Sequence, residues 1–152
     1  MLETLQESWL AHAIGESQMI TALLSSLHLI GFTLVMGSAL ISGLRRTGAL
    51  LADVPVGDVT RPAGRALATG LAISACTGIL LFVPRASGAA ANPIFRVKLT
   101  LIVAALFVTV LLHRTMVTSP LASTGMQRLG GAVGLALWIG VALAGCAFIL
   151  VE

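Results

Sequence analysis

Three histidines are the residues of this chain best suited to chemistry. His28 and His113 lie within long apolar segments, and His12 precedes the first of them. Ionisable side chains are costly inside a membrane, so each one there is a functional hypothesis by default. In helical bundles, imidazoles on facing helices serve as axial ligands of haem iron. The three histidines are therefore candidate haem ligands, and His28 and His113 are the candidate metal ligands.

Cationic side chains accompany these histidines at two levels along the bundle. The outer pole comprises His28, Lys98, Arg96 and His12, and the inner pole comprises His113, Arg114, Arg45, Arg46 and Arg65. Arginine and lysine bind carboxylates such as the propionates of haem. The pattern predicts His28 as an axial ligand of haem b and His113 as a ligand at a second site. The predicted propionate partners are Lys98, Arg45 and Arg46.

The two intramembrane histidines are expected at different depths. With a rise of about 1.5 Å per residue, His28 and His113 differ by roughly 19 Å in an upright bundle. Two imidazoles on one iron need backbones at nearly the same level, so these two do not share a haem within one chain. Each needs another partner, either His12 for the outer pole or a second subunit. The sequence therefore predicts a homo-oligomer or a larger membrane redox complex.

Two other functions stay open on the residues alone. In a cofactor-free structural or assembly subunit, His28 is a buried, hydrogen-bonded imidazole and His113 is an interfacial residue beside Arg114. A copper-handling protein uses soft ligands. The candidates for that role are His28, Met36, Cys76 and Met19. The redox spectrum of the purified protein distinguishes haem, copper and no cofactor.

The sequence lacks the patterns of hydrolases and transferases. It has no Ser/His/Asp set, no paired carboxylates in an apolar segment, no CxxC or CxxCH and no phosphate-binding loop. The apolar segments contain no Asp or Glu, which argues against a proton- or cation-driven transporter. As an activity, the sequence supports at most electron transfer.

Long apolar segments must position these residues. The chain is 57% hydrophobic and 10% charged, whereas a soluble domain carries about 25% charged residues. A helix needs about 20 apolar residues to cross a bilayer. The pattern predicts an all-α integral membrane four-helix bundle, a single transmembrane domain covering residues 1–152. The predicted spans cover about residues 19–44, 64–84, 93–114 and 128–151, and residues 45–65 and 85–93 are predicted connections.

The segment before the first span has helical spacing of its own. Apolar Leu2, Leu5, Trp9 and Leu10 alternate with Glu3, Glu7 and His12. This pattern predicts an amphipathic helix over about residues 2–15 at the membrane interface. A cleavable signal is not expected, because signals have a basic n-region and this segment is acidic.

Basic residues predict the orientation of the chain. The first and third connections hold Arg45, Arg46, Arg61, Arg65, Arg114 and Arg128, whereas the other side holds Arg85, Arg96 and Lys98. Because Lys and Arg mark the cytoplasmic side, both termini are expected outside the cytoplasm. There is no long run of Lys or Arg, so the lipid bilayer is the expected surrounding and no nucleic-acid partner is expected.

Small residues recur at four-residue spacing in two of the spans. They are Gly70, Ser74 and Gly78 in the second span and Gly130 and Gly134 in the fourth. Such stripes let helix backbones approach closely in lipid. The stripes predict close helix packing, with room for a planar cofactor as the alternative.

Several short motifs resemble a known family. They are Leu27-His28-Leu29-Ile30-Gly31, Gly37-Ser38, Leu44-Arg45-Arg46-Thr47-Gly48, Thr77-Gly78-Ile79-Leu80-Leu81-Phe82, Asn92-Pro93-Ile94-Phe95, Lys98 and His113. Over about residues 20–115, the pattern is similar to a family of small bacterial four-helix membrane proteins, a domain of unknown function. It also resembles the membrane domain of copper-resistance D (CopD) proteins and cytochrome-b-like bundles.

The resemblance implies a redox or metal role. The expected location is the bacterial inner membrane, and the distribution of basic residues places both termini on the periplasmic side. The resemblance also implies a topology like that of small cytochrome-b-like bundles. The chain departs from di-haem cytochrome b proteins because its spans lack four histidines. Two bis-histidine haems per chain are therefore not expected.

Overall fold

The computed structural model describes residues 4, 6–118 and 124–151. Its elements are α2 (Trp9–Glu16), α3 (Gln18–Thr47), α4 (Val56–Phe82), η1 (Val83–Arg85), α5 (Ala86–Ala91), α6 (Pro93–Thr118) and α7 (Thr124–Val151). Helical segments long and apolar enough to cross a membrane are Gln18–Thr47, Val56–Ala91, Pro93–Arg114 and Gly125–Phe148. The predicted all-α, four-helix membrane bundle is confirmed, and the chain is a multi-pass membrane protein.

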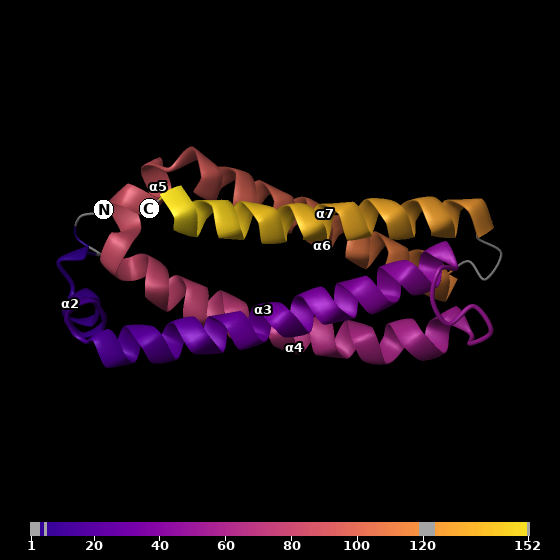
Figure 1. Cartoon of the computed structure of the whole chain (residues 1–152), viewed down its shortest axis with the longest axis horizontal. Coiled ribbons are helices and arrows are strands. Elements are labelled where there is room, and N and C mark those ends of the chain that lie inside the picture. Colours follow the sequence, from indigo (N-terminus) through magenta and orange to yellow (C-terminus); the bar gives the residue numbers. More distant parts are fainter. Residues whose placement is uncertain (1–3, 5, 119–123, 152) are drawn as a thin grey trace.

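The four long helices pack in the order α4, α3, α7, α6. Helix α3 packs against both α4 and α7, and α7 packs against α6. Figure 1 shows the pair α3 and α4 in one layer and the pair α6 and α7 in the other. Helix α2 lies at the same end as the last turns of α7, and residues 48–55 lie at the opposite end, called here the inner end.

Small residues bring α3 and α4 into backbone contact. A Cβ placed on Gly31 would lie 2.8 Å from the carbonyl oxygen of Gly70 and 2.7 Å from Ser74 Oγ. A Cβ on Gly70 would lie 2.6 Å from the carbonyl oxygen of Gly31. No larger side chain fits at this crossing, so the close packing predicted from the small-residue stripe of α4 is confirmed.

A second close crossing joins α3 to α7 nearer the inner end. A Cβ on Gly131 would lie 2.6 Å from Arg46 Cβ and 3.2 Å from the carbonyl oxygen of Gly43. Here the contact involves the base of an arginine side chain. The crossing therefore fixes where the Arg46 side chain leaves α3.

An apolar core lies between these features and ties all four long helices together. Its buried members are Val35, Ala39, Leu67, Ala105, Trp138 and Val141. The indole Nε1 of Trp138 donates a hydrogen bond to Thr109 Oγ1 at 3.2 Å. In α3 and α6 the core positions fall between the outer-pole residues His28 and Lys98 and the inner-pole residues Arg46 and His113, so the core separates the two levels.

The helix predicted over residues 2–15 is interrupted in the structure: Thr4 and Gln6 are helical, Glu7 and Ser8 form a turn, and α2 extends from Trp9 to Glu16. Ser8 is the N-cap of α2, because its Oγ accepts a hydrogen bond from the backbone N–H of Ala11. Leu2, Glu3 and Leu5 lie outside the described residues. Ala11 and Ile14 are buried, so one face of α2 is covered by the bundle.

The connection predicted over residues 45–65 is much shorter in the structure. Helix α3 continues to Thr47 and ends at Gly48, whose φ of 81° is the left-handed conformation that glycine adopts readily. Helix α4 already begins at Val56. Asp58 lies in its first turn, where a carboxylate interacts favourably with the helix dipole. The turn signal at residues 53–58 therefore marks a helix start rather than the middle of a long loop.

The connection predicted over residues 85–93 is largely helical. The 3-10 turn η1, which contains Pro84, leads into α5, in which Ala86 and Ala89 are buried. The side-chain amide of Gln6 donates to the carbonyl oxygen of Pro84 at 3.1 Å and accepts from Ser87 Oγ at 2.8 Å. These contacts hold the segment before α2 against the end of the second span.

Candidate functional site

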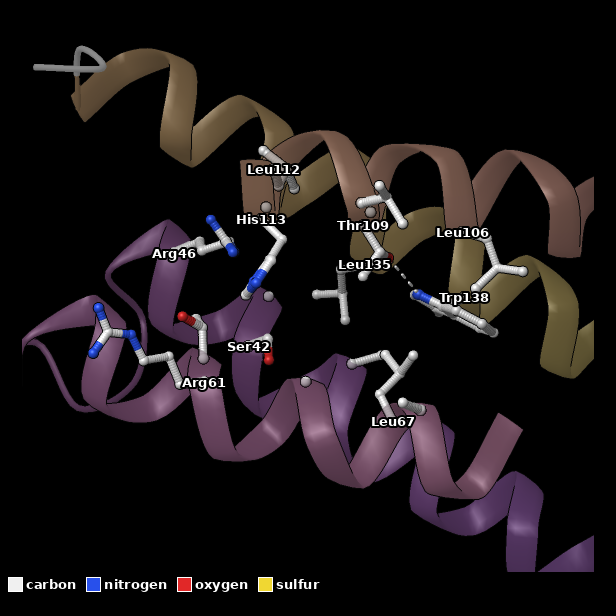
Figure 2. Close-up of a pocket in the computed structure, with 18 of the residues that line it drawn as sticks. Ser42, Arg46, Arg61, Leu67, Leu106, Thr109, Leu112, His113, Leu135 and Trp138 are labelled. Atoms are coloured by element: carbon white, nitrogen blue, oxygen red, sulfur yellow. Dashed lines mark hydrogen bonds between the residues drawn. The ribbon is translucent and has the colours of Figure 1, made fainter. Parts of the chain in front are cut away.

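A pocket of about 700 Å³ lies at the inner end, between the two helix pairs. We call it the inner pocket; its volume is within the range of about 300–1,000 Å³ typical of small-molecule sites. Its polar and aromatic lining side chains are Ser42, Arg46, Thr60, Arg61, Arg65, Thr109, His113, Arg114 and Trp138. Figure 2 shows lining residues from all four long helices around one space, among them Arg46, Arg61, His113 and Trp138.

The walls of the inner pocket are apolar and built partly from small residues. The large apolar members include Leu67, Leu106 and Leu135, and the small ones include Ala39, Gly64 and Gly134. A Cβ on Gly64 would meet no atom within 4 Å. The small residues therefore leave open volume here instead of bringing backbones together.

The charged residues that line the inner pocket are all basic. Four arginines line it, namely Arg46, Arg61, Arg65 and Arg114, and no Asp or Glu is among its described lining residues. Near a low-dielectric membrane interior, such a cluster attracts anions strongly. The arrangement suits a ligand with an apolar body and acidic groups at one end.

His113 is directed into the inner pocket, close to the level of Ser42 and Arg46 (Figure 2). Within the described part of the chain, its ring nitrogens make no hydrogen bond and no ion pair. An imidazole in this setting can coordinate a metal or hydrogen-bond a ligand. Of the predicted ligands, His113 is the one placed in a cavity.

The adjacent arginines Arg45 and Arg46 have different roles. Arg46 is only 9% exposed and lines the inner pocket. Arg45 turns the other way, where its Nε donates to the carbonyl oxygen of Val54 at 2.7 Å and its Nη2 donates to that of Ala52 at 3.3 Å. Arg45 therefore holds the α3–α4 connection and does not line the pocket.

At the outer pole, His28 is held by α4. Its Nδ1 lies 3.1 Å from Thr77 Oγ1, and a Cβ on Gly78 would lie 3.1 Å from its Cε1. The Thr77 hydroxyl hydrogen is directed to the carbonyl oxygen of Ile73 at 2.7 Å. Thr77 therefore accepts from His28 Nδ1–H, and Nε2 keeps its lone pair. The structure gives His28 a protein partner that the sequence did not identify.

Lys98 lies in the outer pole as predicted. A Cβ on Gly145 would lie 3.8 Å from Lys98 Nζ, so the side chain runs along α7. Lys98 is also within electrostatic range of His28 and of Cys146. The sequence thus places His28 and Lys98 correctly at one level, although His28 is not among the residues that line the inner pocket.

The other predicted members of the outer pole are directed elsewhere. Arg96 donates from Nε to the carbonyl oxygen of Ala90 at 2.9 Å. The Nδ1 of His12 lies 3.3 Å from Glu16 Oε1 on the exposed face of α2. His28 is ten residues beyond Gln18, the first residue of α3, about 15 Å along the helix. The structure does not bring His12 to His28.

The candidate copper ligands do not converge. Met19, His28 and Met36 lie on α3 at intervals of eight or nine residues, which is about 12–14 Å along the helix. Cys76 is on α4 and is exposed. Within the described residues, no group of three or more His, Cys, Asp or Glu side chains is placed to hold a metal ion.

Sequence reasoning missed two parts of the inner pocket. Arg61 was assigned to the first connection, but with α4 starting at Val56 it lies one turn from Arg65 on one helix face. The four-residue spacing was the signal for this pair. Trp138 and its hydrogen bond to Thr109 close the deep end of the pocket. No local sequence pattern predicted this contact between α6 and α7.

Comparison with known proteins identifies the family. The chain belongs to a family of unknown function (DUF6644), which matches residues 3–149. No curated protein and no solved structure matches the chain. The expected membership of a family of unknown function is supported, whereas the looser resemblances to CopD proteins and to cytochrome-b-like bundles gain no support. The function is therefore argued from the site.

Proposed function

We propose that this chain binds b-type haem in the inner pocket and serves as an electron-transfer subunit of a larger membrane redox assembly. The observation that supports this most is the exposed imidazole of His113 directed into a pocket with apolar walls, four arginines and no described acidic lining residue. His113 is the proposed axial ligand, whereas the sequence pattern predicted His28 for that role.

The pocket matches the three chemical parts of haem b. The macrocycle is apolar, as are the walls formed by residues such as Leu67 and Leu135. The propionates are carboxylates, which arginines bind in a bidentate manner. Arg46 and Arg61 lie at the same end of the cavity as His113 (Figure 2). The iron accepts an imidazole nitrogen.

The residues of the chain contribute binding, orientation and a dry environment. When bound, haem supplies one-electron chemistry that the side chains themselves lack. The apolar walls exclude water, Arg46 and Arg61 balance the acidic groups, and Trp138 limits the depth of the site. A low-dielectric pocket and its nearby positive charges both act on the reduction potential of such a group.

The inner pocket provides one imidazole, so a second axial ligand has to come from outside the described lining. No Met, Cys or second His is among the described lining residues. We therefore propose that the chain works as a homo-oligomer or with a partner subunit. Native mass spectrometry in mild detergent should show a dimer or a heteromeric complex. A monomer with full haem occupancy and two axial ligands contradicts this part of the proposal.

The proposal places both termini on the periplasmic side of the bacterial inner membrane, supported by the arginines gathered at the inner end. In a variant whose native cysteines are replaced by serine, Gly88→Cys should react with an impermeant thiol reagent in intact cells. Asp53→Cys should react only after lysis, because it lies in the connection at the inner end. The reverse labelling pattern contradicts the orientation and leaves the haem proposal untouched.

The test of the haem proposal compares the two intramembrane histidines. Membranes containing the chain should show a reduced-minus-oxidised b-type spectrum that follows its expression. His113→Ala should weaken haem binding by at least about 100-fold, since even second-shell changes cost roughly 10–100-fold at metal sites. His28→Ala is the matched control and should retain the spectrum, because His28 is held by Thr77 outside the pocket.

Two outcomes contradict this proposal. One is a protein that stays colourless after haem supplementation, and the other is a spectrum lost in His28→Ala but kept in His113→Ala. The first favours a cofactor-free structural subunit, a role consistent with the His28–Thr77 bond as an internal contact. The second returns the axial role to His28, whose Nε2 keeps a lone pair.

A further inference from the structure

Two walls of the inner pocket do not pack against each other. Helix α4 contributes residues such as Arg65 and Ala68, and α6 contributes residues such as Val110 and His113. Within the described chain, α4 packs on α3 and α6 packs on α7, but α4 and α6 form no extended packed pair. Among the described residues the pocket is lined by α3, α4, α6 and α7 alone, and α4 and α6 meet only through the apolar core at its deep end.

The exposure of the lining residues places the open side of the inner pocket on the lateral surface. Val110 lines the pocket and is 50% exposed, and Arg65 and Ala68 are exposed lining residues of α4. Both helices belong to membrane-spanning segments. The medium at an exposed flank of such helices is lipid, so the opening faces acyl chains.

The length of the inner pocket suits one acyl chain. Its lining residues on α4 extend from Thr60 to Leu71, which corresponds to about 16 Å along the helix. One leaflet contributes about half of the roughly 30 Å hydrocarbon thickness of a bilayer. The arginines lie at the end nearer the membrane surface, and the apolar residues lie deeper, which is the polarity of a lipid.

We infer that an anionic phospholipid enters the inner pocket from the bilayer between α4 and α6. One acyl chain lies along the apolar walls toward Trp138, and the phosphate lies at Arg61 and Arg65, one helical turn apart on α4. This inference uses the same pocket as the proposed haem site and stands without it. If haem also binds there, the two ligands exclude each other.

Trp138 provides an internal reporter for this inference. The chain has two tryptophans, so Trp9→Phe leaves Trp138 as the only indole. Trp138 is 3% exposed, which keeps its ring away from bulk lipid around the bundle. Bromine on an acyl chain quenches indole fluorescence on close approach, so quenching of Trp138 reports a chain inside the pocket.

The experiment uses the full-length, haem-free chain in phosphatidylcholine vesicles with increasing fractions of brominated lipid. Brominated phosphatidylglycerol should quench Trp138 at a lower mole fraction than brominated phosphatidylcholine, by about fivefold for each arginine engaged. Arg61→Gln should reduce this preference by about fivefold. Arg45→Gln is the control, because Arg45 does not line the pocket and should leave the preference unchanged.

A steric variant tests the cavity itself. Gly64→Phe should abolish the quenching by filling the pocket, since a Cβ at Gly64 meets no atom within 4 Å. Gly37→Phe is the matched control, because Gly37 is equally uncrowded and does not line the pocket. If Gly64→Phe does not fold, the Arg61→Gln comparison decides.

The outcomes that overturn the inference are specific. No quenching by either lipid means that the pocket is closed to the bilayer, and equal quenching by both means that the arginines do not select an anionic lipid. Neither result concerns haem, which is titrated separately by its absorbance. Haem binding without quenching refutes the lipid alone, and quenching without haem binding refutes the haem proposal alone.

Discussion

The two histidine levels of this bundle show how one fold treats the same side chain in opposite ways. At the outer pole, His28 contacts Thr77 and lies against Gly78, and α3 and α4 are in backbone contact one turn away. At the inner end, His113 is directed into a pocket of about 700 Å³. A histidine within a membrane span is therefore not a functional residue by its position alone; the space beside it decides.

Small residues produce both environments. Gly31 and Gly70 face each other across α3 and α4, so the missing side chains are replaced by backbone. Gly64 faces no atom within 4 Å, so its missing side chain is replaced by empty volume. The same residue type thus allows backbone contact at the α3–α4 crossing and leaves open volume in the inner pocket, depending on whether its partner helix presents another small residue.

The largest effect expected on stability tests the α3–α4 crossing at Gly31 and Gly70. Gly70→Ala places a Cβ 2.6 Å from the carbonyl oxygen of Gly31, so α3 and α4 have to separate. We expect a loss of about 1–3 kcal/mol in the free energy of unfolding, as for overpacked cores. Denaturation in mixed micelles, followed by circular dichroism, measures it.

The matched control for this change is Gly37→Ala, where a Cβ meets no atom within 4 Å. It should be neutral or stabilising by up to about 1 kcal/mol, because alanine is the better helix former. Equal destabilisation by the two variants shows that the α3–α4 crossing is not the constraint described here.

The next prediction tests the role of Arg46 in the inner pocket. Arg46→Gln removes a pocket-lining charge and should weaken haem binding by about 10–100-fold, the equivalent of roughly 1.5–3 kcal/mol for a charged hydrogen bond. Arg45→Gln should leave haem affinity unchanged and instead loosen the connection at Val54. Absorbance titration measures both affinities. Equal loss in the two variants means that general positive charge, not the pocket, governs binding.

The smallest effect concerns the partner of His28. Thr77→Val removes the hydroxyl that accepts from Nδ1–H, and intramembrane hydrogen bonds of this kind contribute about 0.6 kcal/mol on average. Thr33→Val is the control, because Thr33 Oγ1 bonds only to the Leu29 carbonyl oxygen in its own helix. A double-mutant cycle with His28→Ala isolates the coupling. A coupling free energy near zero, together with an equal loss of stability in Thr33→Val, shows that Thr77 is not the hydrogen-bond partner of His28.

Part of the candidate site was predictable from the sequence. The inner pole of His113, Arg114, Arg46 and Arg65 follows from the lengths of the spans, because helical rise fixes the depth of each residue. Arg61 was missed because the start of α4 was placed too late. Arg45 was misassigned because adjacent residues on a helix point about 100° apart, and depth alone does not reveal which of the two faces the bundle.

The sequence by itself determined that this chain lies in a membrane, that its four long segments are helices and which residues share a level. Hydrocarbon cannot satisfy backbone polar groups, so long apolar segments have to form helices there. The packing of the helices was needed to show that His28 has a partner, that His113 lines a pocket, and that this pocket has exposed lining residues on α4 and α6. Those outcomes depend on which side chains meet across helices, and contacts between distant segments are set by packing, not by local spacing.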